Sequence, residues 1–217
     1  MRSQFLRGVL FLIAIVLWAH SSLFADAQPD LSSPKKAATA FALALQKGDF
    51  AALKGVTTGG ADDYKLMQSV TGMTAAANKL HDAIVSRFGA EEGKKIPLTT
   101  GEPGDIPRQI EESDEKVEGN SASITKKGAA AGNSVKLKKD GGVWKVDLSQ
   151  FPQKDQIVLQ APMLDTTGKV LAQAATDVSA GKYKSATEAS QDVQQRMMAA
   201  MASMMKSAQP PATQGSR

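Results

Sequence analysis

Asp62, Asp63, Tyr64 and His81 are the side chains of this sequence best suited to acid–base chemistry. An acid–base catalyst needs a carboxylate or imidazole facing an apolar cavity, and a donor such as tyrosine that steadies a developing oxyanion. Asp62, Tyr64 and His81 are therefore the candidate catalytic residues. Each also has an ordinary interpretation. The aspartates stand at the start of a predicted helix, whose dipole favours negative charge there, and His81 lies on the flank of that helix.

Other catalytic patterns do not stand out in the sequence. We find no paired carboxylates, no nucleophile next to a base and no glycine-rich phosphate loop. The absence of cysteine excludes thiol catalysis, and two histidines with scattered carboxylates make no ligand set for zinc or calcium. We therefore expect a non-catalytic protein with no cofactor and no metal site. A pocket enzyme of the isomerase or dehydratase type is the alternative.

Five methionines gather near the C-terminus. Helical spacing places four of them near one face, which Val193 and neighbouring alanines continue. Thioethers bind Cu(I), so copper handling is a third hypothesis. We favour a flexible apolar stripe that packs on the domain or on a partner of variable shape. The predicted interaction residues are Met197, Met198, Met201, Met204 and Met205.

The first residues have the pattern of a cleavable signal peptide. Arg2 and Arg7 precede an apolar run over residues 8–18, and Ala25-Asp26-Ala27 offers the small-x-small pattern of a cleavage site. The run is too short to span a bilayer comfortably, which needs roughly 20 apolar residues. We expect residues 1–27 to be removed and the exported protein to work in the periplasm or the extracellular medium. An uncleaved N-terminal anchor is the alternative.

The composition limits the classes of binding partner that we expect. The formal net charge is only +4, with charges interspersed along the chain, which argues against nucleic acid. Without cysteine the fold depends on its core rather than on disulfides. We expect a protein or a small apolar ligand as the partner, no stable membrane span after cleavage, and a second copy of the chain as one possible partner.

Helix signals dominate the first half of the chain. Ser33 and Pro34 predict a helix start, and Gly48 predicts its end after Lys47. Asp49 then suits the cap of a second short helix. A stripe with helical spacing follows, which predicts a long amphipathic helix; its members are Leu66, Val70, Met73, Ala77, Leu80, Ile84 and Phe88.

Strand signals follow a predicted long loop over residues 89–108, with a short strand at 96–98. Alternating patterns and the Asp140-Gly141 turn predict a curved antiparallel sheet of about four strands. Its apolar face would be covered by the preceding helices, which makes an α+β domain. The predicted strands are 109–117, 121–126, 133–139 and 143–148.

The last third of the chain reads as helix. Leu171, Ala174, Ala175 and Val178 share a helical face, and Ser185 with Glu188 matches a capping box, so we predict a helical hairpin. The expected organisation is a domain over residues 28–152, a helical extension over 153–206 and a disordered tail over 207–217.

Two segments resemble the nuclear-transport-factor-2-like superfamily. Residues 33–41, Ser-Pro-Lys-Lys-Ala-Ala-Thr-Ala-Phe, run into Leu-Gln-Lys-Gly-Asp-Phe at residues 45–50, similar to a first helix that ends in Gly-Asp-aromatic. Residues 135–148, with Gly-Val-Trp-Lys-Val, are similar to the family's closing hairpin. The resemblance implies a curved sheet wrapped around a long helix, with a pocket inside. It covers residues 33–150 and leaves the helical extension as a departure.

The fold does not select a function, because this scaffold hosts enzymes, ligand carriers and dimerisation modules. We expect an exported, non-catalytic domain that binds a ligand or a partner, with the methionine-rich helix as its interaction element.

Overall fold

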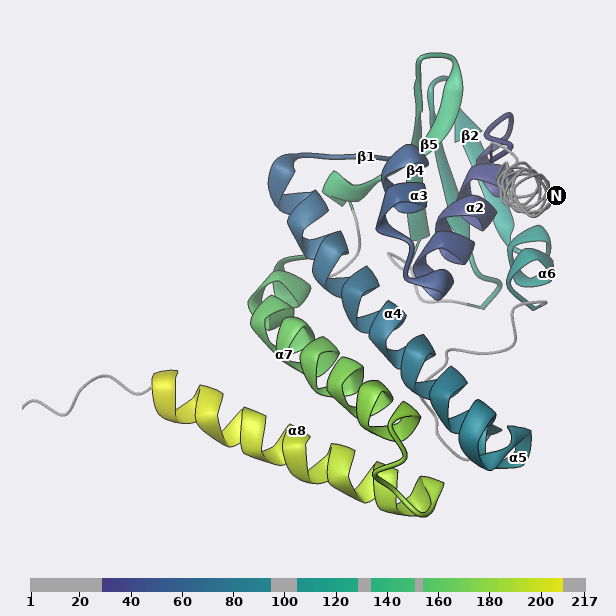
Figure 1. The fold of residues 1–217 in the computed structure, drawn as a ribbon. Coiled ribbons are helices and arrows are strands. Elements are labelled where there is room, and N and C mark those ends of the chain that lie inside the picture. Colours follow the sequence, from purple (N-terminus) through teal and green to yellow (C-terminus); the bar gives the residue numbers. More distant parts are fainter. Residues whose placement is uncertain (1–28, 95–104, 129–133, 151–153, 209–217) are drawn as a thin grey trace, which may run out of the picture.

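The computed structural model describes residues 29–94, 105–128, 134–150 and 154–208. Within these ranges the protein is α+β, with seven helices and one open five-stranded sheet. Figure 1 shows the sheet with α2 (Pro34–Lys47), α3 (Phe50–Gly55) and α6 (Asp105–Glu111) at one end and the long C-terminal helices, with α5 (Ala90–Lys94), at the other. The predicted signal peptide, the strand at 96–98 and residues 209–217 lie outside the described residues.

The two predicted N-terminal helices are confirmed. Helix α2 (Pro34–Lys47) begins at Ser33, whose Oγ accepts a hydrogen bond from the Lys36 N–H at 3.3 Å. It ends at Gly48, which has φ 69°. Helix α3 (Phe50–Gly55) begins at Asp49, whose side chain accepts from the Ala52 N–H at 2.9 Å.

The long amphipathic helix is also confirmed, as α4 (Ala61–Phe88). Its buried stripe, however, contributes to two separate cores. Leu66 belongs to a core beneath the sheet, whereas Leu80 and Ile84 belong to a second core formed with the C-terminal helices. The expectation that the sheet wraps around this helix is therefore wrong for most of its length. A later helix, α7 (Lys154–Ser179), covers the rest of the stripe because it follows the sheet and returns along α4.

The sheet has one strand more than expected and is mixed. Its order is β1-β5-β4-β3-β2, with antiparallel pairing from β2 to β5 as predicted and a short β1 that runs parallel to β5. Strand β1 has only two residues, too few for an alternating apolar pattern in the sequence, so only its pairing with β5 defines it. The strands are β1 (Thr57–Thr58), β2 (Asp114–Glu118), β3 (Ser121–Thr125), β4 (Ser134–Asp140) and β5 (Val143–Asp147).

The start of the first predicted strand is wrong. Part of residues 109–117 belongs to α6 (Asp105–Glu111), and part of the predicted loop forms α5 (Ala90–Lys94). Pro107 is tolerated in a first helical turn, and glutamine and glutamate favour helix over strand. The strand itself starts only at Asp114.

The predicted apolar face of the sheet is confirmed. Leu137 pairs with Val146 across β4 and β5, and both are buried together with Trp144. Phe41 of α2 closes over this face. A short 3-10 turn, η1 (Leu148–Gln150), buries Leu148 at the end of β5. The sheet-side core therefore contains large aliphatic and aromatic side chains.

The C-terminal helices form the second core. Helix α7 runs parallel to α4, with Gly168 beside Met73 and Gly181 beside Arg87. After a turn, α8 (Ala186–Ala208) begins at Ser185, whose Oγ accepts from the Glu188 N–H at 3.2 Å. The Ser185 cap is confirmed, whereas the Glu188 carboxylate accepts from the Lys184 N–H at 2.8 Å and not from the Ser185 N–H that a capping box uses. The helix ends at Ala208, two residues inside the predicted tail.

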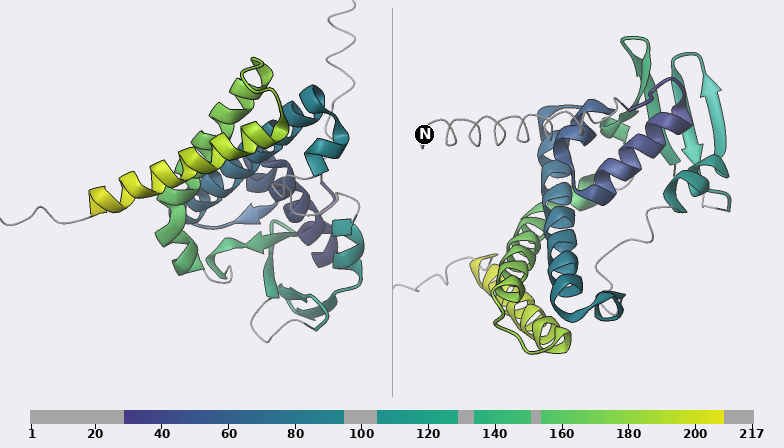
Figure 2. Two further views of the ribbon diagram at one scale, coloured as in Figure 1. Left: turned by 90° about the horizontal axis from the view of Figure 1, so that it is seen from below. Right: turned by 45° about the vertical axis from the view of Figure 1, so that its right-hand side comes forward.

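The Figure 2 views show α4, α7 and α8 as three long helices, of which α7 and α8 lie away from the sheet. None of the described helices combines the length and the apolar character that crossing a bilayer requires.

Candidate functional site

The three candidate catalytic residues do not converge. Asp62 and Tyr64 lie in the first turn of α4, and His81 lies 17 residues further on, about 25 Å along a helix at 1.5 Å per residue. The Asp62 side chain is 89% exposed. The structure therefore separates these residues instead of assembling a shared acid–base site.

Each candidate has a local structural partner. The Tyr64 hydroxyl donates to the Thr57 carbonyl oxygen at 3.3 Å, which ties α4 to β1. His81 Nδ1 lies 3.6 Å from the carboxylate of its neighbour Asp82. Asp63 is buried, and its carboxylate accepts from the Gly60 N–H at 2.8 Å, which caps the helix start. Asp62 lies 3.6 Å from Lys65 Nζ on the same helix, so all these contacts are local.

The predicted interaction residues lie in the C-terminal half of α8. We call residues 197–205 the distal segment; it contains five methionines, three alanines and one serine, and no charge. Met198 is 63% exposed and Met201 is 41% exposed. Met197 and Met204 are half-buried, and the Met205 side chain lies outside the described part. Two large flexible apolar side chains thus face solvent side by side.

The distal segment lies beyond both cores. Among the described residues, Val193 is the last residue of α8 that packs on the helical core. In Figure 1 and in the left view of Figure 2, the end of α8 extends past α7. The proximal half of α8 is thus part of the fold, whereas the distal half is presented outward.

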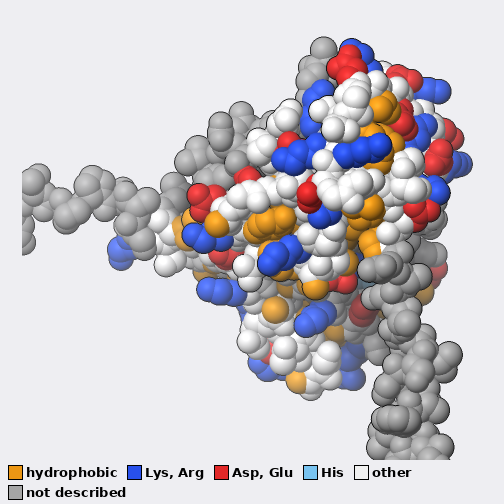
Figure 3. All heavy atoms as spheres, turned by 90° about the horizontal axis from the view of Figure 1, so that it is seen from above, with side chains coloured by type: hydrophobic (Ala, Val, Ile, Leu, Met, Phe, Trp, Pro, Cys, Tyr) orange, Lys and Arg blue, Asp and Glu red, His pale blue; other side chains and the backbone are white. Residues whose placement is uncertain are grey.

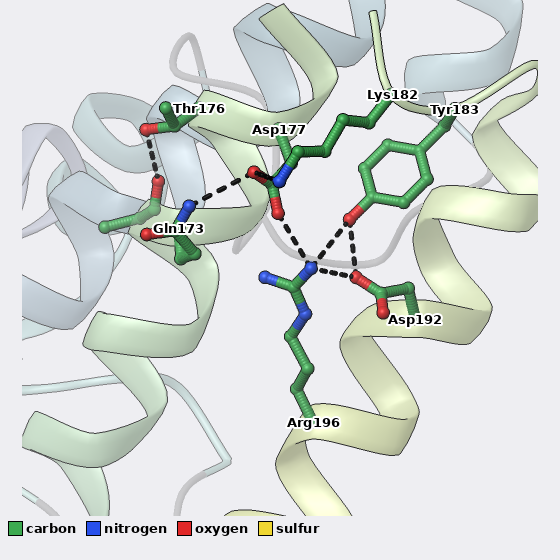
Figure 4. A network of polar contacts seen from close by, with 8 residues as sticks. Gln173, Thr176, Asp177, Lys182, Tyr183, Asp192 and Arg196 are labelled. Atoms are coloured by element: carbon green, nitrogen blue, oxygen red, sulfur yellow. Dashed lines mark hydrogen bonds and ion pairs between the residues drawn. The ribbon is translucent and has the colours of Figure 1, made fainter. Parts of the chain in front are cut away.

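A polar network fixes the direction of α8 (Figure 4). At its centre is Asp177 of α7, with a side chain only 3% exposed. One carboxylate oxygen accepts from Lys182 Nζ at 2.6 Å, and the other accepts from Arg196 Nη2 at 2.7 Å. Because Arg196 precedes the distal segment directly, the network anchors α8 at the point where it leaves the core.

Charge complementarity stabilises this network. The Lys182 ammonium and the Arg196 guanidinium beside it hold the pKa of Asp177 well below its usual range, so the carboxylate is ionised at neutral pH. Gln173 adds a further hydrogen bond at 3.1 Å. A buried carboxylate with both oxygens engaged by cations is a fixed structural element.

Tyr183 extends the network into α8. Its hydroxyl donates to an Asp192 carboxylate oxygen, which also lies 2.7 Å from Arg196 Nη2. Burial and the hydrogen bond to Asp192 raise the pKa of Tyr183 to about 12. A phenol with so high a pKa is not matched to proton transfer near neutral pH. The network therefore ties α8 to α7 at Asp177.

Sequence reasoning missed this network. One signal was present, because Asp192 and Arg196 stand four residues apart on a predicted helix, a spacing that favours an ion pair. Asp177 gave no such signal, since its partner Arg196 lies 19 residues away on another helix. Only the packing of α7 against α8 brings them together.

A second feature not foreseen is a groove of about 700 Å³ on the outer side of α2. Helix α3 and helix α6 form its walls, and most of the side chains that line it are small. We call it the α2–α3 groove. Its apolar lining residues are Ala40, Leu43, Ala44, Ala51, Ala52 and Val56, with Pro107 of α6 at one wall.

Few other candidate binding sites lie on the surface of the described residues. On the face drawn in Figure 3, positive and negative side chains are interspersed with small hydrophobic patches. The described residues contain no group of three histidine, cysteine, aspartate or glutamate side chains able to hold a metal ion. A smaller hollow of about 270 Å³ lies over the outer face of the sheet, with Lys116, Lys136 and Asp147 around it.

Comparison of the chain with family models, curated proteins and solved structures gives no match.

Proposed function

We propose that this protein is an exported, non-catalytic binding domain that uses the distal segment of α8 as its interaction element. The observation that carries the proposal is the contrast within one helix. Its proximal half is held by the network around Asp177, whereas Met198 and Met201 beyond it are exposed. A fixed helix that presents flexible apolar side chains is suited to binding the surface of another protein.

The fold assignment and the export are part of the proposal. Membership of the nuclear-transport-factor-2-like superfamily is supported by the Gly48-Asp49-Phe50 corner after α2 and by the β4–β5 hairpin that carries Trp144. Export is supported by the pattern of residues 1–27 in the sequence.

Site-specific photo-crosslinking in the native host tests the interaction element. A photoreactive residue at Met201 should give a discrete protein adduct after irradiation, whereas the same residue at Val117, which is 49% exposed on β2, should give none. Adding Met198→Glu should weaken adduct formation about tenfold or more, because it places a charge in a desolvated contact.

The matched control is Gln194→Glu with Gln195→Glu, which adds charge to exposed positions of the same helix. This variant should keep the adduct. An equal loss of the adduct in both variants, or equal adducts at positions 201 and 117, would contradict the proposed function.

A further inference from the structure

Two apolar features of the described residues complement each other. One is the distal segment of α8, and the other is the α2–α3 groove. We propose that the distal segment of one copy docks in the α2–α3 groove of a second copy. The proposal rests on the proposed function and names the partner as the chain itself.

Size and shape support the pairing. The groove is hollow because Ala40, Ala44, Ala51 and Ala52 line it with small side chains. The distal segment offers the opposite, long unbranched methionine side chains that adapt to irregular surfaces. Laying an apolar helix face in such a groove is a recurrent mode of recognition.

The lengths also agree. Along α2 the groove extends from Lys36 to Lys47, twelve residues or about 18 Å of helix. The nine residues of the distal segment span about 13 Å as a helix. The groove is therefore long enough for one face of the uncharged segment to lie along it, and the flanking Arg196 and Lys206 fall near its ends.

Charge favours the same arrangement. The distal segment is bounded by two cations, Arg196 and Lys206. The charged residues around the groove have an acidic excess of one; they are Asp30, Asp49 and Glu111 against Lys36 and Lys47, and Asp30 pairs with Lys36 at 2.7 Å. Exposed pairs of this kind contribute little affinity but favour correct orientation during association.

A second copy is required because the segment cannot reach the groove of its own chain. Figure 1 and the right view of Figure 2 place α2 and α8 at opposite ends of the molecule. The Asp177–Arg196 pair holds α8 in that direction. Reciprocal docking of two copies would fill both grooves in a closed dimer, whereas one-way docking would extend into larger assemblies.

Disulfide trapping tests the contact directly, because the chain contains no cysteine of its own. Full-length chains with Met201→Cys and with Ala52→Cys are mixed under mild oxidation. The expected product is a mixed disulfide between the two variants, formed at least about tenfold faster than in a mixture of Met201→Cys with Val117→Cys. Ala52 and the control position Val117 are both exposed, so the rates of chance collision with the Met201→Cys chain should be similar.

Light scattering over a concentration series gives the second readout. The unaltered chain should associate, and Ala52→Glu should weaken association about tenfold or more, since it places a carboxylate in the groove. Ala52 is exposed on α3, so the variant should keep its circular dichroism and thermal midpoint.

The possible outcomes separate the two proposals. Disulfides formed mainly between two Met201→Cys chains would show that the distal segments of two copies pair with each other. This result would overturn docking in the α2–α3 groove and would leave the distal segment as the interaction element. A monomer at every concentration, with a photo-adduct at Met201 to a different protein, would overturn the second copy alone. A fluorescent fatty-acid analogue that fills the groove of a monomeric chain would also overturn it. Equal trapping at positions 52 and 117 with no photo-adduct would remove both proposals.

Discussion

The two cores of this protein are built from different side chains, although they share one helix. The sheet-side core packs large residues, with Leu53, Leu137 and Trp144 among those almost fully buried. The helical core is rich in alanine and lets α4 and α7 approach closely at Gly168. Large side chains bury much apolar area, whereas small ones gain contacts through the proximity of backbones.

Because of this difference, the two cores are sensitive to different kinds of substitution. A sheet covered by large side chains loses stability mainly when a side chain is removed. A tight helix pair is also damaged when a side chain is added, and it relies on the polar network around Asp177 to hold its third helix. Because α4 belongs to both cores, we expect the two to unfold together.

The largest expected effect comes from truncating the centre of either core. Leu80→Ala in the helical core and Leu53→Ala in the sheet-side core should each lower the free energy of unfolding by about 2–5 kcal/mol. Each variant should keep a single transition, because α4 couples the cores. Urea denaturation followed by circular dichroism and by tryptophan fluorescence measures the free energy of unfolding. Separate midpoints for the two probes would show that the cores unfold independently.

A smaller loss should follow Gly168→Val, about 1–3 kcal/mol. Even a Cβ at this position would lie 3.3 Å from the Met73 Cα, so a larger side chain pushes α7 away from α4. Gly72→Ala is the matched control, because its Cβ would meet nothing within 4 Å, and it should stabilise α4 by up to about 1 kcal/mol. Equal thermal midpoints for the two variants would contradict close packing here.

Asp177→Asn should lower the thermal midpoint at pH 7 by less than Gly168→Val does, and should alter its response to acid. The folded state holds the pKa of Asp177 below its ordinary value of about 3.9. This stabilisation is present above that value and is lost as the pH falls below it. In thermal melts from pH 7 to pH 2, the midpoints of the two proteins should therefore draw closer below about pH 4; parallel curves would argue against the ion pairs.

The alkaline side tests the other end of the same network. The pKa of Tyr183 is raised to about 12, so its contribution is complete below the ordinary value of about 10 and is lost as the pH rises from there toward 12. Tyr183→Phe should cost about 1 kcal/mol at pH 7, the value of one hydrogen bond. Ultraviolet titration of the phenols should show a tyrosine that ionises late in the unaltered chain and not in the variant.

The smallest effect on stability should come from the distal segment. Met198→Gln with Met201→Gln should change the free energy of unfolding by no more than about 0.5 kcal/mol, since both side chains are exposed and lie outside the two cores. Val193→Ala, on the same helix but against the helical core, is the contrasting variant and should cost more. Equal losses in urea denaturation would show that the distal segment packs on its own chain.

Much of the local structure was predictable because its signals are local. Ser33, Pro34 and Gly48 bound α2 as expected, and Asp49 caps α3. The wrong assignment at residues 109–111 arose because a short helix joins a strand there without a glycine between them. The two-residue strand β1 depends entirely on its partner β5.

The candidate site was predicted in part. Helical spacing identified the methionine stripe, but periodicity alone cannot tell a buried face from an exposed one. The structure leaves Met198 and Met201 exposed, whereas Met197 and Met204 of the same segment are half-buried, so the two pairs lie on different faces of α8. The residues proposed for acid–base chemistry are separated by the length of a straight helix, which their sequence distance already implied once that helix was accepted.

By itself the sequence determined the helices with clear caps, the hairpin at Asp140-Gly141 and the alternation that gives the sheet one apolar face. These depend on neighbours within a few residues. The tertiary structure alone decided that α4 serves two cores, that Asp177 pairs with Arg196, and that a groove lies outside α2. Such features depend on contacts between segments far apart in the chain, and no local pattern records which surfaces will meet.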